Sequence, residues 1–255
     1  LMLLLICTAG ATAYDINPEV EACIRKNAPE ATAIQHIRLR SVGALLEEKV
    51  LTAQVYWKHL PVGTSNLLAV FDEPEDISGS RLLFLEKESG NEIYLYMPAL
   101  FKVRRITSGR ISSSMYGMDF SYEDFQWLYN MPSTAVSEQR PDSVLDGEPM
   151  YVFAVVPAEG EKSRYEEVVS YFDKKSCVIR KVEFYEQGGK LRKLLKTEPD
   201  AIKPVSGILV PHAFLMRDVK KDSETELTVT AVDVDPAIPD AIFDPARLKE
   251  RRGIE

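Results

Sequence analysis

An apolar alternation with a period of two residues constrains the fold of this chain more than any other feature. Over residues 51–58 the order is Leu51, Thr52, Ala53, Gln54, Val55, Tyr56, Trp57, Lys58. Ile37 and Leu39 repeat the pattern between His36, Arg38 and Arg40. Since successive side chains of a β-strand point to opposite faces, this pattern predicts antiparallel strands that are covered on one face.

Short runs rich in β-branched and aromatic residues recur along the rest of the chain. They cover residues 67–71, 82–85, 93–97, 151–156, 168–172, 178–184, 208–216 and 227–234. Turn residues separate them, and Glu88–Asn91 and Gln187–Lys190 have the composition of hairpin loops. The even spacing favours one long antiparallel meander over strands that alternate with helices.

Two short helices are expected. The first begins at Asn17 and Pro18, a good cap followed by a residue that fits the first helical position, and it ends near Pro29. The second lies within residues 119–129, with Ser121 as its cap. A helix this short is unstable alone, so it must pack its aromatic side chains on the sheet. No repeat or linker divides the chain, which predicts a single domain over residues 14–255.

The first thirteen residues have the pattern of a secretory leader. An apolar run from Leu1 to Cys7 passes through small residues to Ala13, and polar sequence begins at Tyr14. This predicts a signal peptide remnant over residues 1–13, cleaved after Ala13. The run is far shorter than the ~20 residues that a membrane-spanning helix needs. The alternatives are a buried N-terminal strand and a lipid anchor on Cys7, although Ile6 is bulkier than the usual residue before a lipidated cysteine.

Cys23 and Cys177 remain after the leader is removed. In an oxidising compartment a disulfide between them is allowed. Closing so long a loop would stabilise the fold by ~4 kcal/mol on the chain-entropy model. Two separately buried thiols are the alternative, because the sequence does not establish that the two Cα atoms lie close together.

The composition argues against several classes of function. The chain carries 31 basic and 39 acidic residues, a net charge of −8, so no nucleic acid partner is expected. Three cysteines and the isolated His36, His59 and His212 offer little for a metal site, and neither a metal nor another cofactor is expected. The sequence has no nucleophile elbow and no phosphate-binding glycine loop. The acidic pair Asp233 and Asp235 fits a solvated strand face.

These absences favour a protein that is not an enzyme. The enzymatic alternative is a secreted hydrolase that uses scattered carboxylates and histidines.

The stretch Lys102-Val103-Arg104-Arg105-Ile106, followed by Arg110, is the clustered positive charge of an otherwise acidic chain. One interpretation is a strand with a solvated face. The other is contact with anionic lipid head groups or with an acidic partner.

A family resemblance rests on three consecutive segments, Glu92–Leu100, Lys102–Ile106 and Met115–Asp124. Their sequence resembles the W-L-Y-x-P, R-R-I and G-S-D-F-S-Y-E-D run of the outer-membrane lipoprotein-sorting-like (LolA-like) proteins of bacteria. The resemblance extends from about Ala28 to Phe243. The motif residues are Pro98, Arg104, Arg105, Gly117, Asp119, Phe120, Ser121, Tyr122, Glu123 and Asp124.

The resemblance implies a mainly β fold, in which a strongly curved antiparallel sheet forms an unclosed barrel and a few helices cover its concave face. It also implies a periplasmic carrier that binds lipid or lipoprotein acyl chains in an apolar cavity, supports their transport to the outer membrane and contacts membrane surfaces transiently. The alternative within the same fold is a non-enzymatic accessory or sensor subunit of an export system of the resistance-nodulation-division (RND) type, with an inner-membrane permease as partner.

Apolar side chains of the predicted strands and of the second helix are the candidates for lining such a cavity. They are Leu51, Val55, Trp57, Leu82, Phe84, Tyr94, Tyr96, Phe120, Phe125, Trp127 and Leu128. For each residue the alternative is an ordinary place in the core, because core and cavity walls use the same side chains. Tyr94 and Tyr96 share a strand face, and their hydroxyls would suit the mouth of a cavity.

Overall fold

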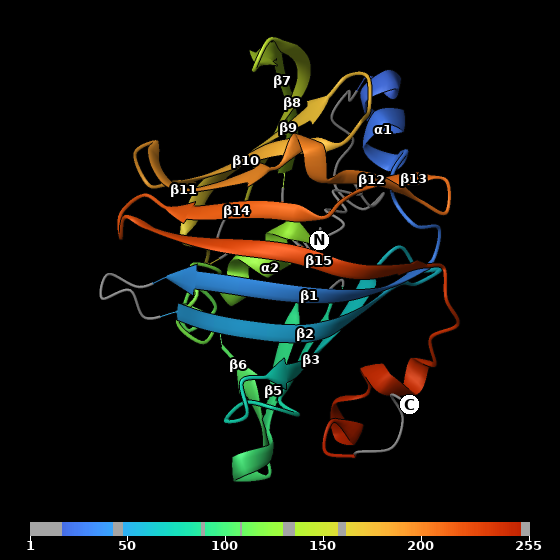
Figure 1. Cartoon of the computed structure of the whole chain (residues 1–255), viewed down its shortest axis with the longest axis vertical. Helices are drawn as coiled ribbons and strands as arrows, with labels where there is room; N and C mark the ends of the chain where they lie inside the picture. The colour runs from blue at the N-terminus through green and yellow to red at the C-terminus, as the bar shows by residue number, and fades with distance from the viewer. Residues whose placement is uncertain are drawn as a thin grey trace.

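A strongly curved, antiparallel sheet of 13 strands dominates the molecule (Figure 1). The computed structural model describes residues 17–42, 48–87, 90–107, 109–129, 136–157 and 162–250. The predicted leader, with Cys7, lies outside the described residues, as do Glu88 and Ser89 of one predicted loop. No helix among the described residues has the length and apolarity needed to cross a membrane.

The strands of the sheet fall into two groups along the chain. The first group is β1 (Thr32–Val42), β2 (Glu48–His59), β3 (Ser65–Glu73), β4 (Arg81–Leu85), β5 (Glu92–Met97) and β6 (Lys102–Ile106). The second group is β7 (Val136–Leu145), β8 (Glu148–Val156), β9 (Tyr165–Asp173), β10 (Ile179–Glu186), β11 (Lys190–Thr197), β14 (Ala213–Asp218) and β15 (Ser223–Val234). A separate two-stranded sheet pairs β12 (Ile202–Val205) with β13 (Ile208–Pro211).

The order of the strands is β6-β5-β4-β3-β2-β1-β15-β14-β11-β10-β9-β8-β7, so β6 and β7 are the two edges and the sheet is not closed into a barrel. The predicted mainly β fold with an unclosed, curved antiparallel sheet is confirmed. The predicted single meander is wrong in one respect. Each group forms its own run of neighbours, and the first and last strands, β1 and β15, join the two runs through pairs such as Leu39 with Leu227.

The two predicted helices are present. In α1 (Pro18–Arg25) the Asn17 side chain accepts a hydrogen bond from the Glu19 backbone N–H at 2.9 Å. In α2 (Tyr122–Leu128) Ser121 is the cap, and α2 lies behind β15 and β1 in Figure 1, on the concave side of the sheet. Short 3₁₀ turns follow β5 (Pro98–Leu100), precede β12 (Pro199–Ala201) and end the described chain (Asp240–Phe243 and Pro245–Arg247).

The concave face carries the main hydrophobic core. Leu51, Val55 and Trp57 of β2 belong to it together with Phe120 of the segment before α2, and each is almost inaccessible to solvent. Val20 of α1 closes the same core and has no exposed surface. The alternation in the sequence therefore put the correct residues on the covered face.

Part of the convex face is covered as well. Ile238, Ile242, Phe243 and Leu248 of the C-terminal segment pack against β3, β4 and β5 in a second buried cluster. This segment, in red, lies at the lower right in Figure 1, beside the lower strands. Strands β3 to β5 are therefore buried on both faces, which explains why β4 reads as an unbroken apolar run from Leu82 to Leu85.

The expectation of one strand over residues 208–216 is wrong. β13 ends at Pro211 and pairs with β12, whereas β14 starts at Ala213 and pairs with β11 and β15. The chain changes sheets at His212, after a proline that has no N–H to donate to a ladder. β7 and β11 were not expected, because glutamate, lysine and arginine interrupt their apolar pattern.

Candidate functional site

The concave face brings most of the predicted cavity residues together. One buried cluster contains the candidates from β2, from β4, from α2 and from the segment just before α2: Leu51, Val55, Trp57, Leu82, Phe84, Phe120, Phe125, Trp127 and Leu128. The rings of Phe120 and Phe125 lie 5.4 Å apart, and that of Tyr129 stacks on Phe125 at 6.2 Å. The face is thus apolar and aromatic beneath α2. Its use as a cargo cavity stays a prediction.

Tyr94 and Tyr96 do not join this face. Their strand neighbours Ile93 and Leu95 point to the concave core, so the two tyrosines point to the convex side and pack in the cluster under the C-terminal segment. The Arg81 guanidinium lies over the Tyr96 ring at 5.9 Å and donates to the Leu248 carbonyl at 2.7 Å. Because successive side chains of β5 point to opposite faces, these tyrosines lie on the other face of the sheet from the remaining candidates.

The aspartate that opens the DFSYED part of the motif holds the start of α2 to β15. The Asp119 carboxylate accepts hydrogen bonds from Ser223 Oγ at 2.5 Å and Thr225 Oγ1 at 2.8 Å. The Asp119 backbone N–H donates in turn to Thr225 Oγ1 at 3.0 Å. Asp119 and Thr225 are both buried, so these bonds satisfy polar groups that water cannot reach.

Ser121 and Asp124 form a reciprocal cap at the start of α2. Ser121 Oγ accepts from the Asp124 backbone N–H at 3.2 Å, and Asp124 Oδ2 accepts from the Ser121 backbone N–H at 2.6 Å. Both residues are buried, and this arrangement satisfies two of the free N–H groups at the helix end. The capping role that the sequence predicted for Ser121 is confirmed.

Asp124 also receives two donors from the second group of strands. Lys193 Nζ of β11 lies 2.5 Å from Asp124 Oδ2, and Tyr165 Oη of β9 donates to Asp124 Oδ1 at 2.5 Å. The lysine and aspartate side chains are 3 % and 0 % exposed. Burial and the neighbouring Asp124 charge raise the pKa of Tyr165 well above its ordinary value. The phenol therefore stays protonated and keeps donating.

Glu123 completes the polar contacts of α2. Its Oε1 accepts from Ser163 Oγ at 2.5 Å and from the Arg164 backbone N–H at 2.9 Å. Burial raises the pKa of Glu123, while these two hydrogen bonds oppose the shift. Asp119, Glu123 and Asp124 thus join α2 to β15, to the segment before β9 and to β11. This part of the motif is a structural joint that fixes α2 to the second group of strands.

Sequence reasoning missed the partners of these acids, above all Lys193, Tyr165 and Thr225. A signal for Lys193 was present, because it shares strand parity with Leu195, which packs in the concave core. A lysine at a core position of an alternating strand indicates a buried counter-charge.

The earlier part of the motif lies at the surface edge of the sheet. Pro98 contacts the turn at Gly79, where an added Cβ would lie 3.4 Å from the proline ring. Arg105 Nη2 lies 3.1 Å from Glu92 Oε1 on the neighbouring strand β5, whereas the exposed Arg104 is directed to the other face of β6. Gly117 has φ +82° in the loop before α2, a conformation that favours glycine.

A disulfide joins Cys23 and Cys177, the pairing that the sequence left open. It connects α1 to the turn between β9 and β10, with the two Cα atoms 5.1 Å apart. Asn27 supports the same junction, because its amide donates to the Ser176 carbonyl at 2.8 Å and its Oδ1 accepts from the Leu209 backbone N–H at 2.9 Å.

The histidines and the strand-end carboxylates serve the fold. His36 contacts Gln54, His59 contacts Ser65 and His212 contacts the Val210 carbonyl, each on its own part of the sheet. Among the described residues, no three His, Cys, Asp or Glu side chains gather in a group that could hold a metal ion. The solvated face expected at Asp233 and Asp235 is confirmed, because both residues are exposed, and the Asp235 carboxylate also accepts from the backbone N–H groups of Ala31 and Thr32.

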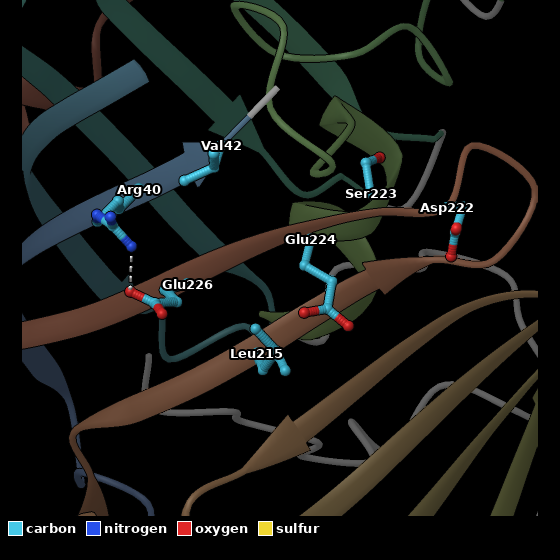
Figure 2. Close-up of a pocket in the computed structure, with 7 residues that line it drawn as sticks. All are labelled: Arg40, Val42, Leu215, Asp222, Ser223, Glu224 and Glu226. Atoms are coloured by element: carbon cyan, nitrogen blue, oxygen red, sulfur yellow. Dashed lines mark hydrogen bonds and ion pairs between the residues drawn. The ribbon is translucent and has the colours of Figure 1, made fainter. Parts of the chain in front are cut away.

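Two hollows on the convex side are lined mostly by polar and charged residues of the described part of the chain. Figure 2 shows the first, of about 290 Å³, between Arg40 of β1 and the acidic start of β15, with Arg40 Nη1 3.5 Å from Glu226 Oε2. The second, of about 720 Å³, lies beside the β3–β4 turn and is lined by Glu48, Val50, Asp72, Glu73, Pro74, Glu75 and Ser78. Neither hollow is the predicted apolar cavity.

Comparison with known proteins identifies the family. A family model described as "uncharacterized protein" matches residues 63–250, more than half of the chain. The chain belongs to this family. A search of curated proteins finds no match.

Solved structures show that this family member has the LolA-like fold. A domain from Vibrio parahaemolyticus described as outer membrane lipoprotein-sorting is similar at a TM-score of 0.80, with 23% identity over 91% of this chain and 97% of that one. A DUF1329 family protein from Desulfovibrio piger gives 0.81, with 20% identity over 90% and 96%. A LolA superfamily protein from Nitrosomonas europaea gives 0.71, with 17% identity over 91% and 98%. The LolA-like fold expected from the motif is confirmed.

Proposed function

We propose that this LolA-like protein is a periplasmic carrier that binds lipid or lipoprotein acyl chains on its concave face and supports their transport to the outer membrane. The observation that carries the proposal is the continuous apolar lining of an unclosed sheet, from β2 through β4 to α2. Acyl chains need such a surface and no catalytic group, because burying each methylene contributes about 0.8 kcal/mol. The protein is not proposed to be an enzyme, and it needs no cofactor for this role.

Cargo enters by displacing or parting side chains of the concave core. The polar joint fixes α2 by its first turn through Asp119 and Asp124, so the end of α2 near Trp127 is the better candidate for local movement. Leu51, Val55, Trp57, Leu82 and Phe84 form the sheet wall of the proposed cavity, and Phe120, Phe125, Trp127 and Leu128 form its cover.

The carrier proposal is tested by mass spectrometry of organic extracts from protein purified without detergent. We expect phospholipid or other acyl species in amounts comparable to the protein, and uptake of a labelled acyl chain. A secreted protein of similar size, expressed and purified in parallel, is the control. Lipid at the level of that control, together with no uptake of the labelled chain, would overturn the proposal.

A second candidate function has the same fold but involves no bound cargo. Val55, Trp57 and Phe120 are each at most 2 % exposed, and the concave residues pack into one cluster, which favours a filled interior. In this alternative the protein is an accessory or sensor subunit of an RND-type export system. Recovery of an inner-membrane permease with the purified protein, combined with lipid-free extracts, would favour this role over the carrier.

A further inference from the structure

The turn between β5 and β6 projects from the molecule and exposes an aromatic side chain. It forms the lowest point of the chain in Figure 1. Phe101 in this turn is 79 % exposed and Leu100 is 49 % exposed. Large apolar side chains are normally withdrawn from water, and an exposed pair at a projecting turn indicates a contact surface.

The backbone of Phe101 makes this placement more unusual. Phe101 has φ 47° and ψ 34°, in the left-handed region where residues with a Cβ are disfavoured, and its N–H donates to the Pro98 carbonyl at 3.0 Å. Other non-glycine residues with positive φ are short polar residues, the buried or half-buried Tyr116, or the disulfide-bonded Cys177. Glycine or asparagine would suit the turn better, so neither packing nor backbone geometry accounts for phenylalanine here.

Cationic side chains stand directly behind the apolar turn. Lys102 and Arg104 are exposed and share one face of β6, and in the part of the chain that the structure describes neither has an ion-pair partner. Arg104 is paired with Leu95, whose side chain packs in the concave core, so the cations lie on the concave side of the edge strand. At about 3.3 Å per residue, Arg104 stands about 10 Å from Phe101.

The geometry points to a docking tip, made of Leu100, Phe101, Lys102 and Arg104, that inserts into the head-group region of an anionic phospholipid bilayer. Interfacial segments bury their apolar side chains about 5–10 Å deep, which places Lys102 and Arg104 at the level of the lipid phosphates. Long cationic side chains keep their charge in the polar layer while their stems lie along apolar surface.

A bilayer fits this tip better than an acidic protein does. The apolar side chains stand on a projecting turn, so a protein partner would need a pocket shaped around them, whereas a bilayer accepts a projecting aromatic ring anywhere on its surface. The attraction to an anionic bilayer comes from the tip alone, because the chain as a whole has a net charge of −8. The role of the docking tip rests on the proposed function. A carrier must approach a membrane to load or deliver its cargo, and the tip would supply that contact.

Vesicle flotation tests the tip with purified protein to which no cargo has been added. We expect binding to vesicles of phosphatidylcholine and phosphatidylglycerol, and little binding to phosphatidylcholine alone. Phe101→Asn removes the ring and introduces a residue that tolerates the left-handed backbone of the turn. This variant should bind the anionic vesicles about tenfold more weakly. Val62→Ser is the matched control, because Val62 is 74 % exposed in the β2–β3 turn at the opposite end of these strands.

Charge variants separate the cationic contribution. Lys102→Gln and Arg104→Gln should each weaken binding to the anionic vesicles about fivefold. Lys220→Gln removes an exposed charge from the β14–β15 turn and should leave binding unchanged. Any contribution to binding that all the variants share cancels in these comparisons.

A tryptophan reporter detects insertion directly. Trp57 and Trp127 are 2 % and 6 % exposed, so a Phe101→Trp variant adds a solvent-exposed fluorophore to a buried background. Its emission should shift to shorter wavelength with anionic vesicles and stay unchanged with phosphatidylcholine vesicles. The parent protein should show no such shift.

Two results would overturn the docking tip. One is equal vesicle binding by the parent protein and by Phe101→Asn. The other is binding that depends on Lys102 and Arg104 but not on Phe101, the behaviour of a cationic face made for an acidic protein. Either result leaves the carrier proposal to the lipid extraction and the uptake test. A protein that is lipid-free, takes up no labelled acyl chain and still inserts at Phe101 would overturn the carrier alone.

Discussion

Two segments of one sequence motif, fewer than fifteen residues apart, have opposite fates in this fold. Lys102–Ile106 forms the edge strand β6, with an exposed phenylalanine just before it and exposed cations along it. Asp119–Asp124 enters the concave core, where Phe120 has no exposed surface and three carboxylates are buried. Both segments contain charges, and an aromatic ring lies within the second segment and directly before the first.

The two segments differ in the partners that their charged side chains have. Asp119, Glu123 and Asp124 each accept hydrogen bonds from side chains distant in the sequence, so their carboxyl groups fix α2 to the second group of strands. Arg104 makes no ion pair within the described residues, so its charge is available to another molecule. Within one motif, the buried acids therefore have a structural role, and the exposed cations are the candidates for recognition.

The largest expected contrast is between two phenylalanines. Phe120→Ala should lower the free energy of unfolding by about 4 kcal/mol, because it empties a fully buried site beneath the sheet. Phe101→Ala should change it by less than about 0.5 kcal/mol, because the ring is 79 % exposed. Urea unfolding followed by circular dichroism measures both, and equal losses would remove the distinction between the two regions.

The next contrast concerns the buried ion pair. Asp124→Asn leaves the Lys193 ammonium buried without a counter-charge and should lower the free energy of unfolding by about 3 kcal/mol. The double variant with Lys193→Met should recover part of this loss, because no unpaired charge remains. Asp222→Asn, in an exposed pair with Arg217, is the control and should have almost no effect. A double variant less stable than Asp124→Asn would contradict the role of the pair.

The pH dependence of stability should differ between the regions. Because burial raises the pKa of Glu123, the native protein binds more protons than the unfolded chain above the ordinary carboxyl pKa. Stability from this group therefore falls as pH rises through the interval between the two values, and Glu123→Gln should remove that fall. Unfolding curves measured at a series of pH values show whether the free energy of unfolding rises or falls with pH. The same dependence on pH in Glu123→Gln and in the parent protein would contradict the prediction.

Glu92, at the end of β5 that lies away from the docking tip, should behave in the opposite way and weakly. The Lys87 hydrogen bond, with Lys87 and Arg105 as nearby cations, lowers the pKa of Glu92, so its contribution is present above the ordinary carboxyl pKa and is lost as pH falls through the lowered value. Glu92→Gln should cost about 0.5 kcal/mol near neutral pH. A double-mutant cycle with Arg105→Gln measures the coupling, and a value above about 2 kcal/mol would show that this edge is a structural joint as well.

Much of the local structure could be predicted from the sequence. The alternation from Leu51 to Trp57 placed each side chain on the correct face, and Asn17 and Ser121 marked the starts of both helices. The break at His212 was missed, because the apolar run continues through it while the backbone changes partners. Tyr94 and Tyr96 were assigned to the cavity because the C-terminal cover of β5 leaves no periodic signal in residues 238–248.

Local sequence patterns are enough to predict most of the strands, both helix caps and the apolar face, since period and capping depend on residues a few positions apart. Which charges are buried and which are available follows from the tertiary structure. Lys193 lies 69 positions from Asp124, and Thr225 lies 106 positions from Asp119. The pairing of β1 with β15 and the passage of α2 across the concave face bring these groups together, and a charge acquires a structural or a recognition role only through such distant neighbours.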